Sequence, residues 1–507
     1  MGLRTTHAVA LFGVDGVLVE IEADVRSGGL PGVQLLGLPD AALQESKNRV
    51  RAAITNSGES WPLSHVTLAL SPAALPKTGT SFDTALAVAV LAATERIPYS
   101  PLEGTVFFGE LALDGRVRMV AGLLPGLLAA TESGMRRAVV PAAGLAEARS
   151  VPGIEVLGAE SLSEVVSWAR GEGDLHQCPT EEFREAAEDV IEEDLADVRG
   201  QPEARRALEI AAAGGHHLLM IGPPGTGKTM LARRLCGLLP ELSAEEALET
   251  TAVHSVAGVL PEGGALVRNA PFVAPHHSVS VSGLIGGGTG LARPGAVSRA
   301  HRGVLFVDEA CEFGAQRLES LRTALEEGEV RISRKDGTLR YPARFQLVLA
   351  TNPCPCAPAR ELDCRCTPQA RRRYLNKLSG PLLDRTDLRV RMRSVTTGDL
   401  VSGGEPESSA RVRARVSRAR EAAAHRWREY GWRTNSEVPG PKLRGKFALP
   451  GTTTALLDRG LDTGALTARG ADRCLRVAWT LSDLDGAERP EAEHVAAALQ
   501  FRERTVV

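Results

Sequence analysis

The stretch GPPGTGKT, residues 222–229, determines the fold at the centre of the chain. It matches G-x-x-x-x-G-K-[ST] and lies between the apolar run HLLMI (217–221) and the helix-like run MLARRLCGLL (230–239). A strand, a Gly-rich loop and a helix are the context that a phosphate-binding loop requires, because glycines let backbone N–H groups approach phosphates. We therefore predict that the whole loop binds a nucleotide through Gly222, Pro223, Pro224, Gly225, Thr226, Gly227, Lys228 and Thr229. Lys228 should reach the β/γ oxygens of ATP, and Thr229 should ligate Mg²⁺.

Two further apolar runs end in polar residues of the kind that hydrolysis needs. GVLFVDE (303–309) should deliver Asp308 to the Mg²⁺ shell and place Glu309 to polarise the attacking water. LVLATN (347–352) should place Asn352 between the two phosphate-binding strands, where it orients that water. Near-continuous apolar runs are typical of strands covered on both faces, so a buried parallel sheet is expected.

Length and composition limit the class of protein. The 507 residues suffice for about three domains. The net charge of −3 excludes a uniformly basic nucleic-acid binder, yet residues 369–393 hold eight bases and only two acids, which predicts a local basic face. No apolar run reaches the ~18 residues of a membrane helix, so no membrane association is expected. Eight cysteines, four of them in one cluster, indicate reduced thiols and a cytoplasmic location.

The pattern along the chain predicts an α/β multidomain protein. Residues 1–175 alternate strands and helices, with a turn at Asp15-Gly16, a helix over 39–58 and a buried helix over 82–95. An acidic linker over 176–195 leads to a strand-loop-helix domain over 196–395. The rest, 396–507, is expected to be mostly helical.

Long stretches of the chain resemble the AAA+ ATPases. They include residues 197–229, APHHSVS (274–280) with GLIGGG (283–288), residues 293–313, residues 342–356 and SGPLLDRTDL (379–388). More specifically, they resemble the magnesium-chelatase-like branch with its ComM/YifB-type competence helicases. The resemblance implies a central AAA+ P-loop domain with two insertions, one at helix 2 and one hairpin before the strand that ends in Asn352. It also implies a C-terminal helical lid.

The same resemblance implies further site residues. Arg385 matches the arginine finger, which completes the site of a neighbouring subunit and therefore implies a ring, expected to be a homo-hexamer. Arg469 matches the lid arginine that senses the γ-phosphate, although Arg473 or Arg476 could take that role. Gln201 is expected near the adenine.

Residues 326–345 have the pattern of a β-hairpin. Two alternating strands, VRIS and LRYP, flank a turn expected at Asp336-Gly337. Arg334 and Lys335 near its tip, with Arg331, suit a phosphate backbone bound without sequence preference; the alternative is a solvated tip. Two other features, the pair His276-His277 and the Arg-rich segment 409–429, fit either DNA contact or an ordinary structural role.

Four cysteines form a C-x-C-x7-C-x-C array: Cys354, Cys356, Cys364 and Cys366. Four thiolates suffice for tetrahedral Zn²⁺, although C-x-C is tighter than the usual pairs. The array predicts either a structural zinc site or four reduced thiols in a loop.

The N-terminal domain resembles the proteolytic domain of Lon, a ribosomal-S5-domain-2-like α/β fold, over residues 76–90 and 107–130. Ser81 falls where the nucleophile lies. Leu124 stands where the lysine of the Ser–Lys pair is expected, and a leucine cannot act as a base. Lys77 is close only in sequence, so we expect a domain without peptidase activity.

These features favour an ATP-driven DNA motor that promotes branch migration or unwinding of single-stranded or branched DNA during recombination or repair. A chelatase-type ATPase that remodels a protein partner is the alternative. The N-terminal domain and the basic hairpin speak against it, because by resemblance chelatase ATPase subunits lack that domain. An ATP-dependent Lon-like protease is the second alternative, weakened by Leu124.

Overall fold

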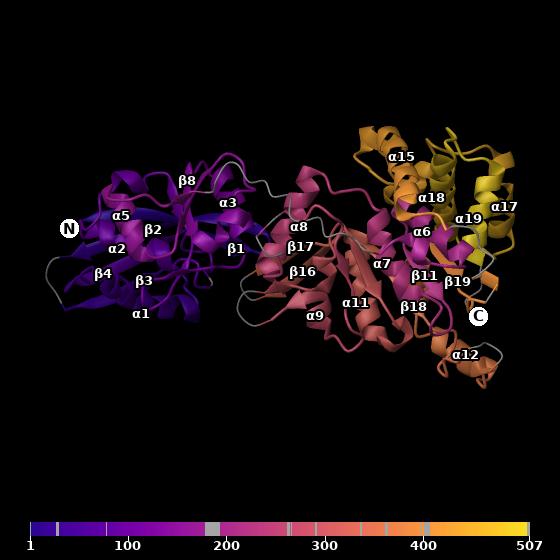
Figure 1. Ribbon diagram of the computed structural model, residues 1–507, viewed down its shortest axis with the longest axis horizontal. Coiled ribbons are helices and arrows are strands. Elements are labelled where there is room, and N and C mark those ends of the chain that lie inside the picture. The colour runs from indigo at the N-terminus through magenta and orange to yellow at the C-terminus, as the bar shows by residue number, and fades with distance from the viewer. Residues whose placement is uncertain are drawn as a thin grey trace.

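The structure is a computed structural model that describes residues 2–26, 30–77, 79–177, 193–260, 264, 266–288, 292–334, 337–359, 363–396, 398–399 and 406–503. It is elongated, with an N-terminal α/β region at one end, a central α/β region and a helical C-terminal region at the other (Figure 1). This order of regions confirms the predicted multidomain α/β fold class. Most of the predicted acidic linker, residues 178–192, lies outside the described residues.

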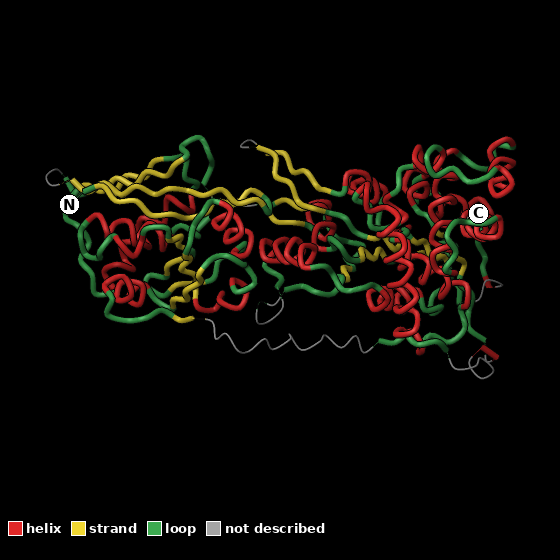
Figure 2. The backbone as a smooth tube through the Cα atoms, turned by 90° about the horizontal axis from the view of Figure 1, so that it is seen from above, coloured by secondary structure: helices red, strands yellow, loops and turns green. Residues whose placement is uncertain are grey.

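An eight-stranded mixed sheet carries the N-terminal region. Its order is β10-β9-β8-β5-β1-β2-β4-β3. The bounds are β1 Leu3–Phe12, β2 Asp15–Arg26, β3 Gly32–Leu36, β4 His65–Ser71, β5 Thr105–Phe107, β8 Arg137–Pro141, β9 Glu155–Ala159 and β10 His176–Gln177. The long β1–β2 hairpin extends toward the central region (Figure 2).

The turn of that hairpin differs from the prediction. Phe12 pairs with Asp15, so the turn is Gly13–Val14 and the predicted turn at Asp15-Gly16 is wrong. Gly13 has φ of 72°, and a Cβ there would lie 2.3 Å from the carbonyl oxygen of Arg340 in strand β17 (Gly337–Pro342). Only glycine tolerates both the left-handed backbone and this close approach, which fixes the turn at this position.

Helices cover the N-terminal sheet as predicted. Helix α1 (Ala41–Asn56) begins at Asp40, whose carboxylate accepts the Leu43 N–H at 2.8 Å, a typical N-cap. Helix α2 (Asp83–Ala93) is buried at every position, which confirms the buried helix expected over 82–95. Helices α3 (Leu123–Glu132) and α5 (Leu162–Arg170) complete this layer.

The central region contains a five-stranded parallel sheet with the order β12-β15-β18-β11-β19. The strands are β11 Leu218–Ile221, β12 Phe272–Val273, β15 Val304–Val307, β18 Gln346–Thr351 and β19 Leu388–Arg391. Every residue of β11, β15 and β18 is buried, because α6 (Pro202–Gly214), α7 (Lys228–Leu238) and α11 (Ala315–Glu327) cover the faces. Strand β18 lies between β11 and β15, as predicted for the strand that ends at Asn352.

Both expected insertions are present. The first contains α8 (Ala244–Ala257), α9 (Val281–Ile285), α10 (Ala296–Arg299) and the short pair β13 (Gly286–Gly287) and β14 (Arg293–Pro294). The second is the hairpin of β16 (Glu329–Arg334) and β17. Its register pairs Arg334 with Gly337, so Gly337 belongs to β17 and the predicted turn at Asp336-Gly337 is wrong by one residue.

The N-terminal region packs directly on these insertions. Leu11 and Val14, beside the β1–β2 turn, join the apolar cluster that contains Ile332 and Leu339 of the β16–β17 hairpin. A second contact joins Glu147 to α8, since its carboxylate accepts the Ser255 hydroxyl at 2.5 Å. Burial raises the pKa of Glu147. The N-terminal region therefore supports the hairpin from one side.

The C-terminal region is helical: α15 Ser409–Trp427, α16 Gly440–Arg444, α17 Gly451–Asp462, α18 Ala468–Asp485 and α19 Ala492–Glu503. Trp427 is fully buried, and its ring meets Trp479 and Phe447 edge to face at 5.5 and 4.7 Å. Helices α12 (Pro368–Leu375) and α13 (Gly380–Arg385) precede β19. Among the described residues, no helix combines the length and apolar character needed to cross a bilayer.

Candidate nucleotide-binding site

The predicted phosphate loop connects β11 to α7. Gly225 and Gly227 have φ of 76° and 90°, which other residues rarely adopt. A Cβ on Gly222 would lie 2.9 Å from Met392 and 3.0 Å from the Thr226 hydroxyl, so this position also needs glycine. Helix α7 begins at Lys228, which places the helix N-terminus, with its free N–H groups, at the loop. The eight residues of the predicted loop thus combine left-handed glycines with a helix N-terminus, a local geometry that suits an anion.

Lys228 and Asn352 meet at this loop. The Lys228 ammonium donates to the carbonyls of Gly222 and Pro223 at 2.6 and 2.9 Å and to Asn352 Oδ1 at 3.2 Å. Burial lowers the pKa of Lys228, while the negative charges of Asp308 and Glu309 act in the opposite direction. The two predicted residues therefore share one site, although they come from different strand ends.

The two predicted Mg²⁺ ligands are also adjacent. The Thr229 hydroxyl donates to Asp308 Oδ2 at 2.9 Å. A hydroxyl and a carboxylate are hard oxygen donors, so the pair fits Mg²⁺, which binds few protein ligands and keeps several waters. Glu309 follows with φ of 49° and ψ of 45°, a left-handed backbone that costs about 1 kcal/mol or more and is common at functional sites.

Sequence reasoning missed the role of one neighbour of Glu309. His277 Nδ1 lies 3.4 Å from Glu309 Oε2. The sequence left the histidine pair open between DNA contact and packing, and the structure brings His277 to the predicted base instead. Only the pairing of β12 with β15 reveals this proximity, because it brings the segment after β12 beside the end of β15.

Gln201 lies against the phosphate loop. Its side-chain amide donates to the carbonyl of Thr226 at 3.3 Å and to that of Arg393 at 2.5 Å. Beside it, residues of the loop before α6, of α6 itself and of the segments before and within α15 line a cavity of about 650 Å³, among them Arg199, Gly200, Pro202, Asp399 and Glu407. This placement is compatible with the expected position near a base.

Arg385 lies at the opposite end of the parallel strands from the phosphate loop of its own chain. Strand β19 runs parallel to β11 with Leu388 opposite Leu218, and Arg385 precedes β19 whereas the loop follows β11. A four-residue strand spans about 13 Å. The guanidinium pairs with Glu326 and donates to the carbonyl of Pro381 at 2.7 Å. Arg385 therefore cannot serve its own nucleotide in this arrangement.

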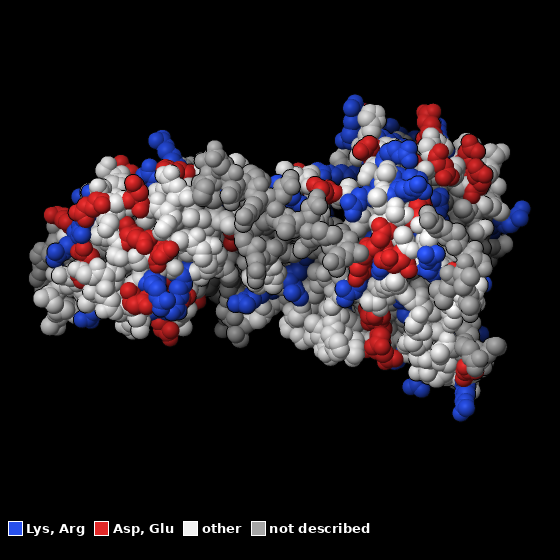
Figure 3. Space-filling view, viewed as in Figure 1, with Lys and Arg blue, Asp and Glu red and all other residues white. Residues whose placement is uncertain are grey.

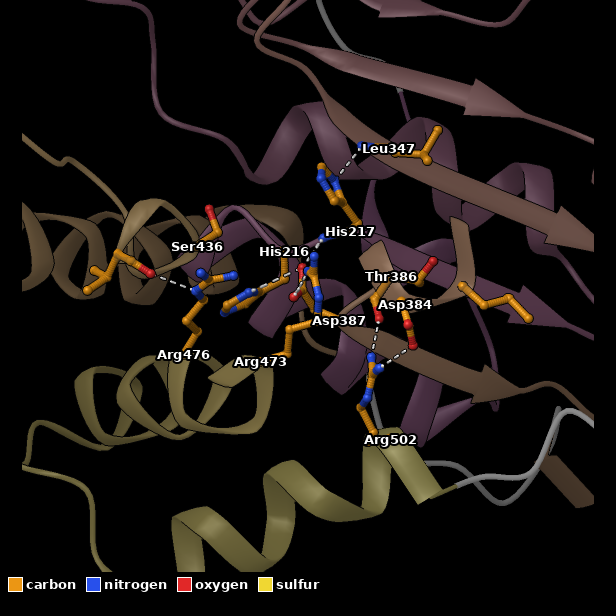
Figure 4. Close-up of polar contacts among 12 residues, drawn as sticks. His216, His217, Leu347, Asp384, Thr386, Asp387, Ser436, Arg473, Arg476 and Arg502 are labelled. Carbon is orange, nitrogen blue, oxygen red and sulfur yellow. Dashed lines mark hydrogen bonds and ion pairs between the residues drawn. The ribbon is translucent and has the colours of Figure 1, made fainter. Parts of the chain in front are cut away.

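The lid arginines separate into two groups. Arg469 is exposed in the first turn of α18, and together with Arg322 and Arg473 its charge adds to burial in lowering the pKa of Arg385. Arg473 pairs with Asp387 Oδ1 at 2.5 Å, and Arg476 donates to the carbonyl of Val438 at 2.8 Å (Figure 4). Both alternatives to Arg469 are therefore engaged in structural contacts within the chain.

A buried polar cluster joins the lid to the sheet beside these arginines. Asp387 Oδ2 accepts the backbone N–H of His217 at 3.0 Å and lies 3.8 Å from His216 Nδ1, at the start of β11 (Figure 4). Burial by itself raises the pKa of Asp387. The positive charge of Arg473 and the contacts with His216 and His217 outweigh burial and hold the pKa well below its usual range.

The four predicted zinc ligands converge. Their sulfur atoms all lie within 4.8 Å of one another, with Cys354 to Cys356 at 3.3 Å and Cys354 to Cys364 at 3.4 Å. A tetrahedral Zn–S₄ centre with ~2.3 Å bonds requires sulfurs about 3.8 Å apart. The residues present therefore fit the metal, and four thiols leave no open position for catalysis.

The hairpin residues are in different environments. Arg331 is half exposed and pairs with Glu327 at 3.1 Å and Glu329 at 2.5 Å. The Arg334 guanidinium donates to the carbonyl of Gly288, and Lys335 lies outside the described residues. The register places Arg340, which the prediction omitted, directly opposite Arg331 on the exposed face. The sequence signal for Arg340 is the alternation in LRYP, which puts Arg340 on the same exposed face as Arg331.

The Arg-rich helix α15 uses much of its charge internally. Arg415 pairs with Glu209 at 2.6 Å and with Glu407, and Arg420 donates to the carbonyl of Ala212 at 2.8 Å. Figure 3 shows Lys and Arg gathered over α15 with acidic side chains close beside them. The structure therefore gives a structural role to these arginines, while Arg411 and Arg418 are exposed.

Two residues were considered as a base for Ser81 in the N-terminal region, Leu124 and Lys77, and neither is suited to that role. Leu124 is fully buried. Lys77 is fully buried as well, and its ammonium donates to the carbonyls of Leu70, at 3.1 Å, and Pro72. Burial lowers the pKa of Lys77. These two hydrogen bonds to backbone carbonyls give Lys77 a structural role.

Comparison with known proteins agrees with this geometry. Family models described as "Magnesium chelatase, subunit ChlI", "Subunit ChlI of Mg-chelatase" and "Magnesium chelatase, subunit ChlI C-terminal" match residues 194–400, 21–144 and 406–502. The strand order, the phosphate loop and the paired acids thus define a magnesium-chelatase-like AAA+ ATPase.

Relatives from several bacteria match over nearly the full length of the chain. It is 57% identical to the uncharacterized protein Rv2897c of Mycobacterium tuberculosis over 505 residues, which is 99% of both chains. It is 40% identical to the uncharacterized protein YifB of Escherichia coli, over 99% of this chain and 97% of the relative. It is also 40% identical to the competence protein ComM of Haemophilus influenzae, over 99% and 98%. The chain belongs to the ComM/YifB-type magnesium-chelatase-like family.

Proposed function

We propose that this protein is an ATP-driven DNA motor that promotes branch migration or unwinding of single-stranded or branched DNA during recombination or repair. The observation that carries the proposal is the hairpin. Arg331 and Arg340 face solvent side by side, on an element inserted directly before the strand that ends at Asn352. Adjacent arginines on a protruding ribbon suit a phosphate backbone bound without sequence preference. This role implies a cytoplasmic location.

The nucleotide site supports ATP and Mg²⁺ as the cofactors. Lys228 would hold the β- and γ-phosphates, and Thr229 and Asp308 would ligate Mg²⁺, which neutralises the developing charge when bound. Glu309 would accept a proton from water as the water oxygen bonds to the γ-phosphorus. The bond to the β–γ bridging oxygen breaks, and ADP and phosphate leave. Asn352 would orient the water, and Gln201 would border the adenine.

The distance of Arg385 from its own phosphate loop supports a ring. Because Arg385 lies at the opposite end of the strands from its own phosphate loop, it would act on the nucleotide of a neighbouring copy. Arg469 is close enough to affect the pKa of Arg385, so we propose that both act on the neighbouring subunit. A closed ring of such contacts, in a homo-hexamer, gives every site one pair of arginines.

We further propose that Cys354, Cys356, Cys364 and Cys366 hold a structural Zn²⁺. The convergence of four sulfur atoms within 4.8 Å supports it. The site begins two residues after Asn352, so the metal would also fix the end of β18.

A second candidate is a chelatase-type ATPase that remodels a protein partner. The family models favour it by their descriptions, and one of them matches residues 21–144. Because this chelatase-subunit model matches most of the N-terminal region, that region does not distinguish the chain from chelatase subunits. The basic hairpin remains as the feature that favours DNA. The protease alternative is not favoured, because Leu124 is buried and apolar and Lys77 is bound to backbone carbonyls, so neither of these two residues would act as a base for Ser81.

The test is ATP hydrolysis with and without forked or three-stranded DNA, with Lys228→Ala as the inactive blank. The motor proposal expects strong stimulation by DNA and strand displacement that depends on Arg385. Hydrolysis that no DNA stimulates would favour the protein-remodelling candidate. Casein digestion, measured in the same preparation, is expected to be absent.

A further inference from the structure

Helix α12 presents three consecutive arginines to solvent. Residues 363–377, which overlap the basic segment 369–393, contain five bases and one acid. Arg371, Arg372 and Arg373 are exposed, and among the residues that the structure describes no carboxylate forms an ion pair with any of them. Exposed cations without local counter-charges attract anions from outside the chain.

The inner face of α12 holds the helix on the end of the parallel sheet. Tyr374 and Leu375 are buried in the apolar cluster that also contains Leu349 of β18. Just after the helix, Lys377 Nζ lies 3.1 Å from Glu312 Oε2. Because these residues occupy the inner face, the arginines face outward, and α12 projects from the body of the molecule (Figure 1).

The cysteine cluster holds the other end of α12. Cys366 directly precedes the N-cap residue Thr367, whose hydroxyl accepts the Ala370 N–H at 3.2 Å. Cys354 is buried and follows the end of β18 by three residues. Zinc bound by the four thiolates would therefore tie the start of α12 to the end of β18 and keep the arginines in place.

The chemistry of this surface fits the phosphates of duplex DNA. Guanidinium groups bind phosphate oxygens bidentately, and such contacts carry no sequence information. Proteins that bind single strands add exposed aromatic rings on which the bases stack. Tyr374 is the only aromatic residue in 363–377, and it is buried. A duplex keeps its bases inside and presents its phosphates, so it suits this surface better than a single strand does.

We propose that Arg371, Arg372 and Arg373 form a binding site for the phosphates of duplex DNA, and that the cysteine cluster holds this site in position. The inference rests on the proposed function and deepens it, because it names the part of a branched DNA that binds here. The β16–β17 hairpin lies on another part of the central region (Figure 1). A branched substrate would then be held at two places, with a duplex arm on α12.

The test measures fluorescence anisotropy of the full chain with a blunt duplex and with a single strand of the same length, at several salt concentrations. The variant is Arg371→Gln/Arg372→Gln/Arg373→Gln. The matched control removes three exposed arginines of the N-terminal region: Arg26→Gln/Arg51→Gln/Arg96→Gln. We expect the α12 variant to lose about tenfold to a hundredfold in duplex affinity, and about three phosphate contacts from the salt dependence. Its affinity for the single strand, its melting temperature and its DNA-free ATP hydrolysis should match the wild type, as should the control throughout.

A second measurement tests the support from the cysteine cluster. Cys356→Ser and prolonged chelation of the wild type should lower the zinc content and the duplex affinity together, with binding of the single strand retained. Zinc content is measured by elemental mass spectrometry. Duplex affinity that persists after the zinc is lost would overturn the positioning role of the cluster.

Three results would overturn the duplex site itself. They are wild-type duplex affinity in the α12 variant, equal losses for duplex and single strand, and a loss of assembly in mass photometry with unchanged duplex affinity. The last result would assign the arginines to contact with a neighbouring subunit. If the wild type binds neither DNA, the proposed function fails together with this inference. If the wild type is stimulated by DNA and only the α12 variant behaves like the control, this inference alone fails.

Discussion

Asp387 and Arg473 form an ion pair at 2.5 Å that links the segment before β19 to helix α18 (Figure 4). Asp387 lies only two residues after Arg385, and Arg473 lies one helical turn after Arg469. The pair therefore connects the two arginines proposed to act on a neighbouring subunit. A rotation of the C-terminal helical region would displace Arg385, because the buried Asp387–Arg473 ion pair joins the two and is costly to break.

The Asp387→Asn substitution should destabilise the protein by about 3 kcal/mol at pH 7, because it leaves Arg473 without its charged partner in a largely buried site. The folded-state pKa of Asp387 is depressed, so its contribution is fully present above the unfolded pKa of about 4 and is lost as pH falls below it. Thermal unfolding from pH 7 down to pH 3 should show wild type and variant converging in acid. The control variant Asp462→Asn, at an exposed position, should have the melting temperature of the wild type at pH 7 and at pH 3. A difference in melting temperature between wild type and Asp387→Asn that stays constant over this pH range would contradict the role assigned to Asp387.

Lys228→Ala and Glu309→Gln should separate nucleotide binding from hydrolysis. Lys228 contacts the phosphate loop itself, so its loss should weaken ATP binding and abolish turnover. Glu309→Gln should keep ATP binding and lower kcat by about 10²-fold or more, since only proton transfer is removed. Fluorescent ATP-analogue binding and phosphate release measure the two effects, with the exposed Lys442→Ala as the control. Equal loss of binding in both variants would argue against the assigned roles.

Arg385→Ala and Lys228→Ala chains should each be inactive alone and partly active when mixed. A Lys228→Ala subunit still presents Arg385 to the intact phosphate loop of an Arg385→Ala neighbour, and a finger contributes about 10³-fold or more to the rate. Phosphate release by mixtures at several ratios measures the recovery, and mass photometry confirms that mixed rings form. Mixed rings without recovered activity would show that Arg385 does not act between subunits.

The purified chain should contain about one zinc ion per polypeptide, measured by elemental mass spectrometry. Cys356→Ser should lose the ion and lower the melting temperature, because three thiolates and a hydroxyl hold zinc poorly. Prolonged chelation of the wild type should have the same effect. Cys236→Ser, which changes a partly buried thiol outside the cluster, should retain the ion; equal metal content in the two variants would refute the site.

Arg340→Ala should weaken binding to single-stranded DNA uniformly across sequences and reduce the dependence of log K on log salt by about one phosphate contact. Arg331 is already paired with two glutamates, so Arg331→Ala should have a smaller effect. Fluorescence anisotropy at several salt concentrations measures both. Arg116→Ala, which changes an exposed arginine of the N-terminal region, serves as the control. A larger loss in Arg331→Ala than in Arg340→Ala would contradict the proposed DNA face.

Some features could be predicted because a local pattern specifies them. The phosphate loop, the buried strands and helix α2 follow from glycine spacing and apolar periodicity within about fifteen residues. The two hairpin turns, predicted at Asp15-Gly16 and Asp336-Gly337, were wrong because each prediction relied on a local signal alone. Asp-Gly pairs are strong turn signals, yet the close approach of Gly13 to Arg340 and the pairing of Arg334 with Gly337 set the actual registers.

The sequence by itself determined the class of protein, since the residues that bind phosphate and activate water lie at fixed offsets from apolar strands. Only the tertiary structure decided which of those residues meet. The strand order placed Asn352 against Lys228 and Thr229 against Asp308, and the parallel direction of β11 and β19 placed Arg385 at the opposite end of the strands from the phosphate loop. It also brought His277 to Glu309 and Asp387 to Arg473. These contacts join segments distant along the chain, and no local pattern encodes them, because they depend on how sheets and helices pack.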